Sequence, residues 1–155
     1  MHVTARGDYA VRAALELAAA DGQTRKVADL AAAQNIPARF LENILLALRR
    51  SGLVQSRRGA DGGFRLTRPP EEITLADVLR AVEGPLANVQ GVAPDQLQYG
   101  GAASSLTDVW VAVRASLRVV LERVTLAEVA SGSLPGDVAA LIADPEAWRV
   151  HSPQV

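Results

Sequence analysis

Residues 36–66, IPARFLENILLALRRSGLVQSRRGADGGFRL, combine a helix with a short hairpin. Pro37 suits the start of a helix, because the N–H that proline lacks has no helical partner at that position. Apolar side chains then recur at helical spacing on a face that we expect to pack inward, namely Phe40, Leu41, Ile44, Leu45 and Leu48. We therefore expect a helix over 37–50 that stops at a Ser-Gly pair. After it we expect two strands within 53–66 around the Gly-rich turn 59–63.

The sequence before this stretch predicts two more helices. Apolar side chains repeat at helical spacing in residues 4–20, and residues 27–34 form a short Ala-rich helix. Asn35 fits the left-handed turn that would separate this helix from the next one. Two helices joined by such a tight turn are typical of a helix-turn-helix. A basic hairpin directly after such a pair is typical of a wing.

Polar residues of the second helix of this pair and of the hairpin suit DNA recognition. Arginine can bind guanine with two hydrogen bonds, asparagine can do so with adenine, and glutamate can accept from cytosine. Arginine also fits a narrow minor groove, and glycine lets the backbone approach a phosphate closely. The alternative is a solvated helix and hairpin with scattered charge. We expect the DNA-binding residues to be Arg39, Glu42, Asn43, Arg50, Arg57, Arg58, Gly62, Gly63 and Arg65.

The two halves of the chain carry opposite charge. Residues 1–70 contain eleven Arg or Lys against six Asp or Glu, whereas residues 71–155 contain five against eleven. The 155 residues together have a net charge of −1. Such asymmetry is typical of a nucleic-acid-binding part joined to a part for regulation or assembly, and a chance distribution of charge is the alternative.

The composition disfavours several other classes of protein. The chain has no cysteine and two histidines, His2 and His151, so we expect no metal site, no catalytic site and no cofactor. The turn 59–63 lacks the Lys-Ser/Thr pair of a nucleotide-binding loop. No apolar run is long enough to span a membrane, and the first residues lack the apolar stretch of a signal peptide. These observations predict a cytoplasmic protein that is not an enzyme and has no membrane partner.

A capped helix, a loop and a long helix follow the hairpin. Thr74 begins a capping-box pattern that predicts a helix over 75–83. The Gly- and Pro-rich residues 84–103 predict a loop. Ser105, with an acidic residue three positions later, predicts the cap of the longest helix, over about 105–124.

The apolar residues of this longest helix repeat in steps of four and three, as in a coiled-coil seam. They are Leu106, Trp110, Val113, Leu117, Val120 and Val124. We expect them to form a dimerisation seam with a second copy, and the alternative is a helix packed in the chain's own core. The predicted division is a winged helix-turn-helix (1–84), a loop (85–104), a dimerisation helix (105–131) and a C-terminal tail (132–155) with a short helix over 137–143. The predicted class is mainly α with a small β-hairpin wing.

Five motifs carry a family resemblance. They are TARGDYAVR (4–12), IPARFLE (36–42), LRRSGLV (48–54), RGADGGFRL (58–66) and PEEITLADVLRAVEG (70–84). With them, the chain resembles the IscR/NsrR-like (Rrf-two) family of bacterial winged-helix regulators over about residues 1–130. The resemblance implies a homodimer with crossed long helices, bound to palindromic double-stranded DNA. By position, it also implies base reading by Arg39, Glu42 and Asn43 and a wing contact by Arg58.

The chain departs from this family where many members bind iron. Those members hold an iron–sulfur cluster with three cysteines before the long helix. Residues 87–107 contain no cysteine here, and Ser104 lies about where the last one would be. Asp8 lies where some relatives supply a carboxylate ligand, but without thiolates we do not expect it to bind iron. The resemblance therefore implies a regulator that responds to a small molecule or a protein.

The sequence thus predicts a homodimeric, sequence-specific DNA-binding transcription regulator, acting as a repressor, that is controlled by a signal other than an iron–sulfur cluster. An alternative is a protein-interaction adaptor that kept the fold but not DNA binding, which the acidic second half and the long loop would suit. A small-molecule sensor without a DNA function, or an enzyme, is a third alternative.

Overall fold

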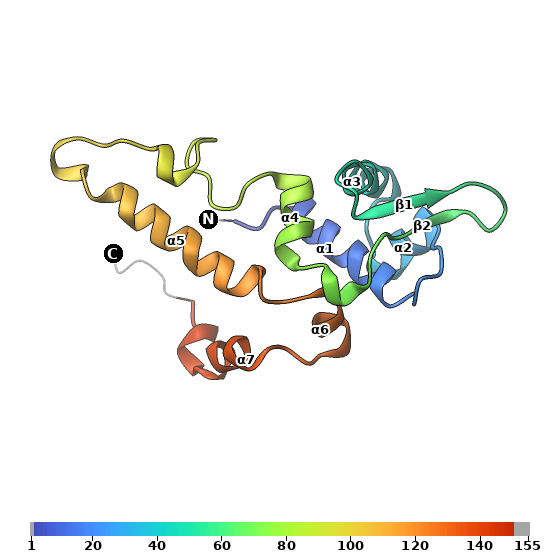
Figure 1. Cartoon of the computed structure of the whole chain (residues 1–155). Helices are drawn as coiled ribbons and strands as arrows, with labels where there is room; N and C mark the ends of the chain where they lie inside the picture. The colour runs from blue at the N-terminus through green and yellow to red at the C-terminus, as the bar shows by residue number, and fades with distance from the viewer. Residues whose placement is uncertain (1, 151–155) are drawn as a thin grey trace.

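The computed structural model describes residues 2–150 and shows a mainly helical protein with one β-hairpin (Figure 1). The helices and strands are α1 (Ala5–Ala18), α2 (Val27–Gln34), α3 (Ala38–Arg50), β1 (Val54–Arg57), β2 (Gly63–Leu66), α4 (Leu75–Glu83), α5 (Leu106–Leu121), α6 (Leu126–Ser131) and α7 (Gly136–Ala143). Short 3-10 turns lie at Pro70–Glu72, Pro94–Gln96, Gly101–Ala103 and Pro145–Trp148. The predicted class is confirmed. No helix within residues 2–150 is long and apolar enough to cross a membrane.

The core lies between α1, α2, α3 and α4. The inner face of α3 buries Leu41, Ile44, Leu45 and Leu48, as predicted. The prediction for Phe40 is wrong, because its side chain is 42% exposed. Phe40 lies at the edge of the apolar stripe of α3 and meets Tyr9 edge-on, with ring centroids 5.8 Å apart.

Local sequence chemistry sets the ends of the first three helices. The Thr4 hydroxyl accepts a hydrogen bond from the Gly7 N–H at 3.0 Å and so caps α1. Asn35 ends α2 in the left-handed conformation, with φ 51°. Pro37 stands at the cap position of α3, so the helix begins at Ala38, one residue after its predicted start. The tight turn of the helix-turn-helix is therefore present between α2 and α3.

The hairpin is tied to the connection between α1 and α2. Strands β1 and β2 are antiparallel, with Val54 opposite Leu66. Beside them, Arg25 and Phe64 exchange two backbone hydrogen bonds, each of 2.8 Å. The half-buried Phe64 side chain packs against the core, as predicted. The wing thus has a third backbone segment at its base, and the sequence did not predict this one.

Helices α4 and α6 begin side by side. Thr74 and Thr125 form an isolated antiparallel bridge, flanked by two backbone hydrogen bonds of 2.9 and 3.0 Å. Each threonine also caps its own helix through a capping box, Thr74 with Asp77 and Thr125 with Glu128. The first of these boxes was predicted. The bridge places the start of α6 against the winged helix-turn-helix, although the loop and α5 separate α4 from α6 along the chain.

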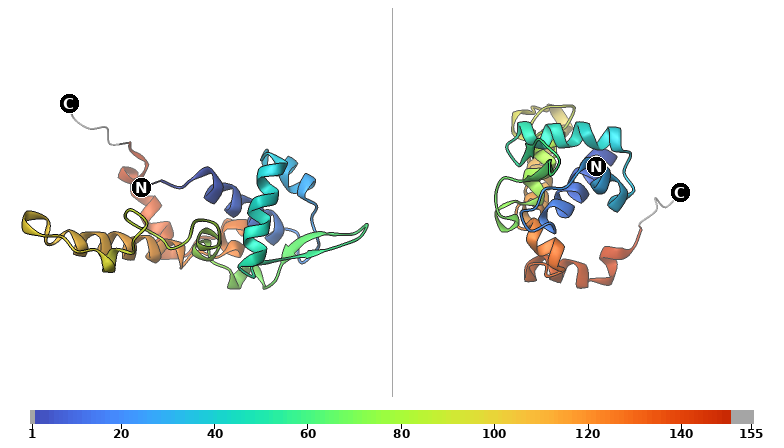
Figure 2. Two further views of the ribbon diagram at one scale, coloured as in Figure 1. Left: turned by 90° about the horizontal axis from the view of Figure 1, so that it is seen from above. Right: turned by 90° about the vertical axis from the view of Figure 1, so that its right-hand side faces the viewer.

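The loop after α4 and helix α5 form an arm that extends away from the body, on the side opposite the hairpin (Figure 2). None of the 16 residues of α5 is fully buried. An ion pair between Arg114 and Asp95 and a hydrogen bond of 2.9 Å from the Thr107 hydroxyl to the Leu97 carbonyl join α5 to the loop. The predicted loop therefore exists, and it lies along the helix that follows it.

Three expectations about the long helix are wrong. The helix ends at Leu121, and α6 is separate from it, so residues 105–131 are not one helix. The Ser105 side chain makes no capping hydrogen bond. Val124 lies beyond the helix and is 2% exposed, inside the chain's own core. The Thr74–Thr125 bridge explains the early end of α5 and the position of Val124. Pairing with the residue before α4 requires extended backbone at Thr125, where the helix would have continued.

The C-terminal segment extends beyond α6 and contains the predicted short helix as α7. It carries apolar side chains on its surface, with Leu141 53% and Trp148 74% exposed. The Trp148 indole N–H donates to the Ile142 carbonyl at 2.8 Å, which folds the last turn back onto α7. His151 and the residues after it lie outside the described residues.

Candidate DNA-binding surface

Helix α3 turns one face to the core and the opposite face to solvent. Arg39, Glu42, Asn43 and Arg50 all lie on exposed positions of this helix. The Asn43 amide donates to the Arg39 carbonyl at 3.4 Å, and the two arginines have no side-chain partner within residues 2–150. The predicted base-reading side chains are thus brought together on one helix and are free to make new hydrogen bonds.

The hairpin divides its side chains between two faces. Side chains alternate along a strand, so Val54 and its partner Leu66 face the core while Gln55 and Arg65 face outward. When the Gln55 amide is oriented with its oxygen toward Arg65, this oxygen accepts two hydrogen bonds from the Arg65 guanidinium, at 3.0 and 3.2 Å. Arg57 is exposed on the same strand as Gln55. The outer face of the wing is therefore basic, as predicted.

Gly62 and Gly63 have roles inside the wing. A Cβ on Gly62 would lie 2.5 Å from the Arg57 carbonyl oxygen, and one on Gly63 would lie 2.5 Å from that of Arg25. Both glycines therefore permit close backbone packing. Their part in DNA binding stays a prediction, because this packing alone accounts for the residue type at both positions.

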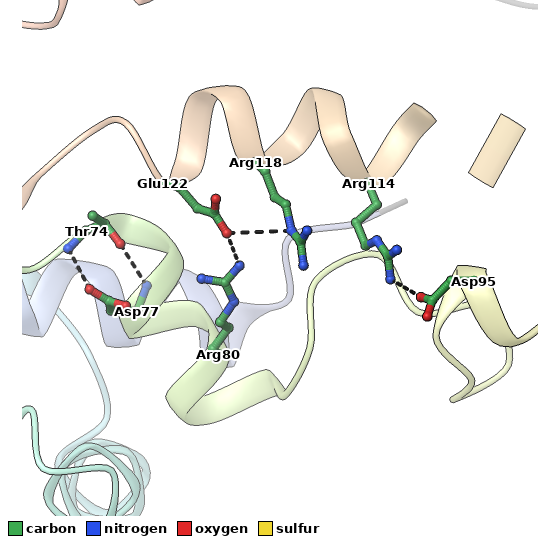
Figure 3. Close-up of polar contacts among 7 residues, drawn as sticks. All are labelled: Thr74, Asp77, Arg80, Asp95, Arg114, Arg118 and Glu122. Carbon is green, nitrogen blue, oxygen red and sulfur yellow. Dashed lines mark hydrogen bonds and ion pairs between the residues drawn. The ribbon is translucent and has the colours of Figure 1, made fainter. Parts of the chain in front are cut away.

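The ion pairs divide the cations of the chain into two groups. Beyond residue 70, every arginine of the described chain forms an ion pair; these are Arg80, Arg114, Arg118, Arg123 and Arg149 (Figure 3 shows the first three). Before residue 70, the one ion pair among the described residues joins Arg12 to Asp8, at 3.1 Å. Within residues 2–150, the cations of that part that have no side-chain partner are Arg6, Arg25, Lys26, Arg39, Arg50, Arg57, Arg58 and Arg68. Unpaired positive charge is thus concentrated in the winged helix-turn-helix.

Sequence reasoning missed Arg6. This residue lies in the first turn of α1, but it lines a hollow of about 320 Å³ with Asn43 and Arg50 of α3. No pattern along the chain indicated it, because the packing of α1 against α3 brings the three side chains together. Arg6 and Arg50 place two unpaired guanidinium groups beside the face of α3 that carries Asn43.

The helix-turn-helix has an exposed polar second helix and is followed by a basic wing. The sequence that forms them matches a known protein family. The model of the Rrf2 family, described as "Iron-dependent Transcriptional regulator", matches residues 3–132. The chain belongs to the Rrf2 family. It is therefore a DNA-binding transcriptional regulator of the helix-turn-helix class, and these names indicate a regulator, not an enzyme.

Rrf2 relatives cover most of the chain. It is 53% identical over 145 residues to Rv1287, a predicted HTH-type transcriptional regulator of Mycobacterium tuberculosis, covering 93% of this chain and 90% of the relative. It is 30% identical over 132 residues to the HTH-type transcriptional regulator CymR of Bacillus subtilis, covering 84% of this chain and 91% of the relative.

Two solved Rrf2 structures share the fold. The structure of CymR, the global cysteine regulator of B. subtilis, superposes with a TM-score of 0.72 at 30% identity and covers 84% of this chain and 97% of that one. The structure of T. potens IscR superposes with a TM-score of 0.67 at 28% identity. The match covers 98% of this chain and 94% of that one. The arrangement of helices and wing is thus that of Rrf2 regulators.

The donor set of this Rrf2 chain does not fit an iron–sulfur cluster. The sequence contains no cysteine, so no thiolate is available. Within residues 2–150, no three His, Asp or Glu side chains come close enough to hold a metal ion. Asp8, which could have served as a carboxylate ligand, pairs with Arg12. The family description mentions iron, but this chain lacks the ligands for the cluster.

The predicted dimerisation residues are only partly available. Leu106, Trp110, Val113, Leu117 and Val120 are half-buried, and Leu117 faces the chain's own loop and the end of α4. The adjoining face of α5 is open: Val109, which borders the predicted seam, is 51% exposed, Val119 is 59% exposed, and the small Ala112 between them is also exposed. The most exposed apolar side chains of α5 are therefore Val109, at the border of the predicted seam, and Val119, outside it.

Proposed function

We propose that this protein is a homodimeric repressor that binds a palindromic operator in double-stranded DNA. The observation that carries the proposal is the concentration of unpaired cations on α3, the wing and the start of α1. Unpaired arginines repel one another and gain most from a polyanion, since each neutralised phosphate releases counterions. In this proposal, Arg39, Glu42 and Asn43 read base edges in the major groove, while Arg57 and Arg58 contact the adjacent minor groove or its phosphates.

Arg6 and Arg50 contact the DNA backbone in this proposal. Their hollow lies beside the base-reading face of α3, where a phosphate of the same groove would pass. Contacts of this kind fix the position of the protein on the duplex without reading sequence. They supply affinity, whereas the base contacts supply the preference for one operator.

The homodimer in this proposal forms through the arm. A helix of 16 residues with no buried side chain is marginally stable in water unless its apolar face is covered. The open face of α5, formed by Val109, Ala112 and Val119, provides such a surface, and its small central residue allows two helices to approach closely. Val124 is left out of the interface, because it belongs to the core of its own chain.

The signal that controls DNA binding is a small molecule or a protein in this proposal, because the chain lacks ligands for a cluster. The deciding experiment is a titration of the purified protein with DNA from upstream of its own gene and with random DNA of equal length. A clear preference for the upstream DNA supports the proposal, and equal affinity would overturn it. A protein that binds neither DNA but co-purifies with a stable partner would be an adaptor instead.

A further inference from the structure

A cavity of about 650 Å³ lies where the winged helix-turn-helix meets the arm, away from α3 and the wing. It is lined by residues 2–4, by the end of α4, by residues 84–88 and Gly91 of the loop, and by the inner face of α5. Its volume lies within the roughly 300–1,000 Å³ of small-molecule sites. The cavity therefore has the size of a ligand site and touches both parts of the protein.

The walls of the cavity are mainly apolar. Leu79 of α4, Leu86 of the loop, and Leu117 and Leu121 of α5 all line it. Leu79 is 9% exposed, whereas the two leucines of α5 are half-buried. An apolar ligand body would displace water from these walls, which is favourable in proportion to the area covered.

One carboxylate in the lining, that of the solvent-exposed Glu83, gives the cavity a negative charge. Glu83 accepts a hydrogen bond from the Thr4 hydroxyl through one oxygen, and its other oxygen has no partner within the described residues. Arg80 lies one turn earlier on α4 but pairs with Glu122 of α5, so it does not neutralise Glu83 (Figure 3). Apart from His2, Glu83 is the one titratable side chain in the lining. Charge complementarity therefore favours a ligand with a positive group.

The loop beside the cavity contains unusual backbone conformations. Ala87, which lines the cavity, has a left-handed backbone with φ of 57°, whereas the φ of 52° at Gln90 belongs to the two-residue turn between the paired Val89 and Val92. Asp21 and Asn35 share this conformation elsewhere, but their residue types adopt it readily, whereas alanine and glutamine do so rarely. Strained residues of this kind cluster at ligand-binding sites. This observation is independent of the charge of Glu83.

We propose that the cavity binds a small molecule with an apolar body and one protonated amino group. The amino group lies on the Glu83 carboxylate, and the body lies between Leu79 and the two leucines of α5. As a ligand site the cavity stands on its own. Its role as the control site rests on the proposed function, because its lining joins Thr4 at the cap of α1 and the end of α4 to α5, which carries the proposed dimer interface.

The test uses two probes of equal length and opposite charge. The full chain, with labelled leucine and valine methyl groups, is titrated with hexylamine and with hexanoic acid and followed by NMR. We expect hexylamine to shift the methyl signals of Leu79, Leu117 and Leu121 and to bind about threefold more tightly than the acid at low salt, the ratio expected for one ion pair with an exposed carboxylate. No DNA is present, so the result is independent of the proposed function.

Two variants complete the test. Glu83→Gln keeps the hydrogen bond to Thr4 and removes the charge, so it should lose the preference for the amine and still bind hexanol. Glu72→Gln removes an exposed carboxylate outside the cavity and should keep the preference. Equal binding of amine and acid by the unaltered chain, or a preference that survives Glu83→Gln, would overturn the proposal. Methyl signals that respond to protein dilution but not to hexylamine would overturn it too, because a second copy would then fill the cavity.

Discussion

Gly63 and Arg25 touch through their backbones, so that a Cβ on Gly63 would lie 2.5 Å from the Arg25 carbonyl oxygen. Gly63 also has a φ of 153°, which side-chain-bearing residues rarely adopt. The contact sits next to the paired hydrogen bonds between Arg25 and Phe64. It fixes the base of the wing to the segment that leads into α2, and hence fixes the angle between wing and helix-turn-helix.

Replacing Gly63 with alanine should therefore loosen the wing. We expect Gly63→Ala to lower the free energy of unfolding by about 1–3 kcal/mol, measured by urea denaturation, and to weaken DNA binding. Gly100→Ala is the control, since Gly100 has an ordinary extended backbone and open space around it. Its effect should stay within about 0.5 kcal/mol. Equal stability of the two variants would contradict the proposed role of the Gly63 contact.

Arg58 should contribute one phosphate contact. Arg58→Ala is expected to reduce the slope of log affinity against log salt concentration by about 0.9. Arg149→Ala removes an arginine that is already paired with Glu146, and it should leave the slope unchanged. The measurement is fluorescence anisotropy with labelled operator DNA at several salt concentrations. An unchanged slope in Arg58→Ala, with altered base preference, would indicate groove readout and contradict the phosphate contact.

Arg6 and Arg39 should differ in what they contribute. Arg6→Ala should weaken binding to every DNA sequence alike and reduce the salt slope by about 0.9, as expected for a backbone contact. Arg39→Ala should cost about 1–3 kcal/mol on the operator and relax the preference at one base pair. Binding to a panel of operators with single base changes separates the two effects. A loss of base preference in Arg6→Ala would be evidence against its placement on the backbone.

The open face of α5 can be tested by placing a charge on it. Val119→Glu should raise the dimer dissociation constant by at least about tenfold, because pairing would bury an unpaired carboxylate. Val92→Glu places the same charge on an exposed position of the loop, where Val92 is 38% exposed, and should have little effect. Sedimentation velocity over a range of concentrations gives both constants. If Val119→Glu dimerises as well as the unaltered chain, another surface forms the dimer.

The cap of α6 makes stability depend on pH. Hydrogen bonds from the Thr125 backbone N–H and hydroxyl hold the pKa of Glu128 below its usual value. The folded state therefore binds fewer protons than the unfolded state in the acid range, so this contribution is complete above the ordinary carboxyl pKa. It is lost as the pH falls through the lowered value. Thermal unfolding of Glu128→Gln should show a weaker acid dependence than the unaltered chain, and an identical profile would contradict this linkage.

The sequence was a sufficient guide to the winged helix-turn-helix because its signals are local. Asn35 at a left-handed turn, Thr74 with Asp77 at a cap, and the Gly-rich turn of the hairpin each act within a few residues. The residues predicted to read bases could be proposed for the same reason, since they lie on the polar face of one amphipathic helix.

The features that escaped prediction depend on contacts between distant segments. Arg6 lies beside Asn43 and Arg50 because α1 packs on α3, and no periodicity along the chain indicates that. The heptad steps of α5 were real, but they could not tell a seam between chains from a face that packs on the chain's own loop, as Leu117 does. Val124 fits the heptad spacing of α5 but lies outside the helix, because the bridge between Thr74 and Thr125 requires extended backbone there.

The bridge between Thr74 and Thr125 has a consequence for how such proteins can diversify. The chain leaves the winged helix-turn-helix at the end of α4 and re-enters it beside the start of the same helix. Loop and α5 are thus an insertion with both ends fixed to one rigid element. Lengthening a segment closed in this way costs little, since closure entropy grows only slowly with length. Selection can therefore replace the loop and α5, cysteines included, while the winged helix-turn-helix keeps its fold.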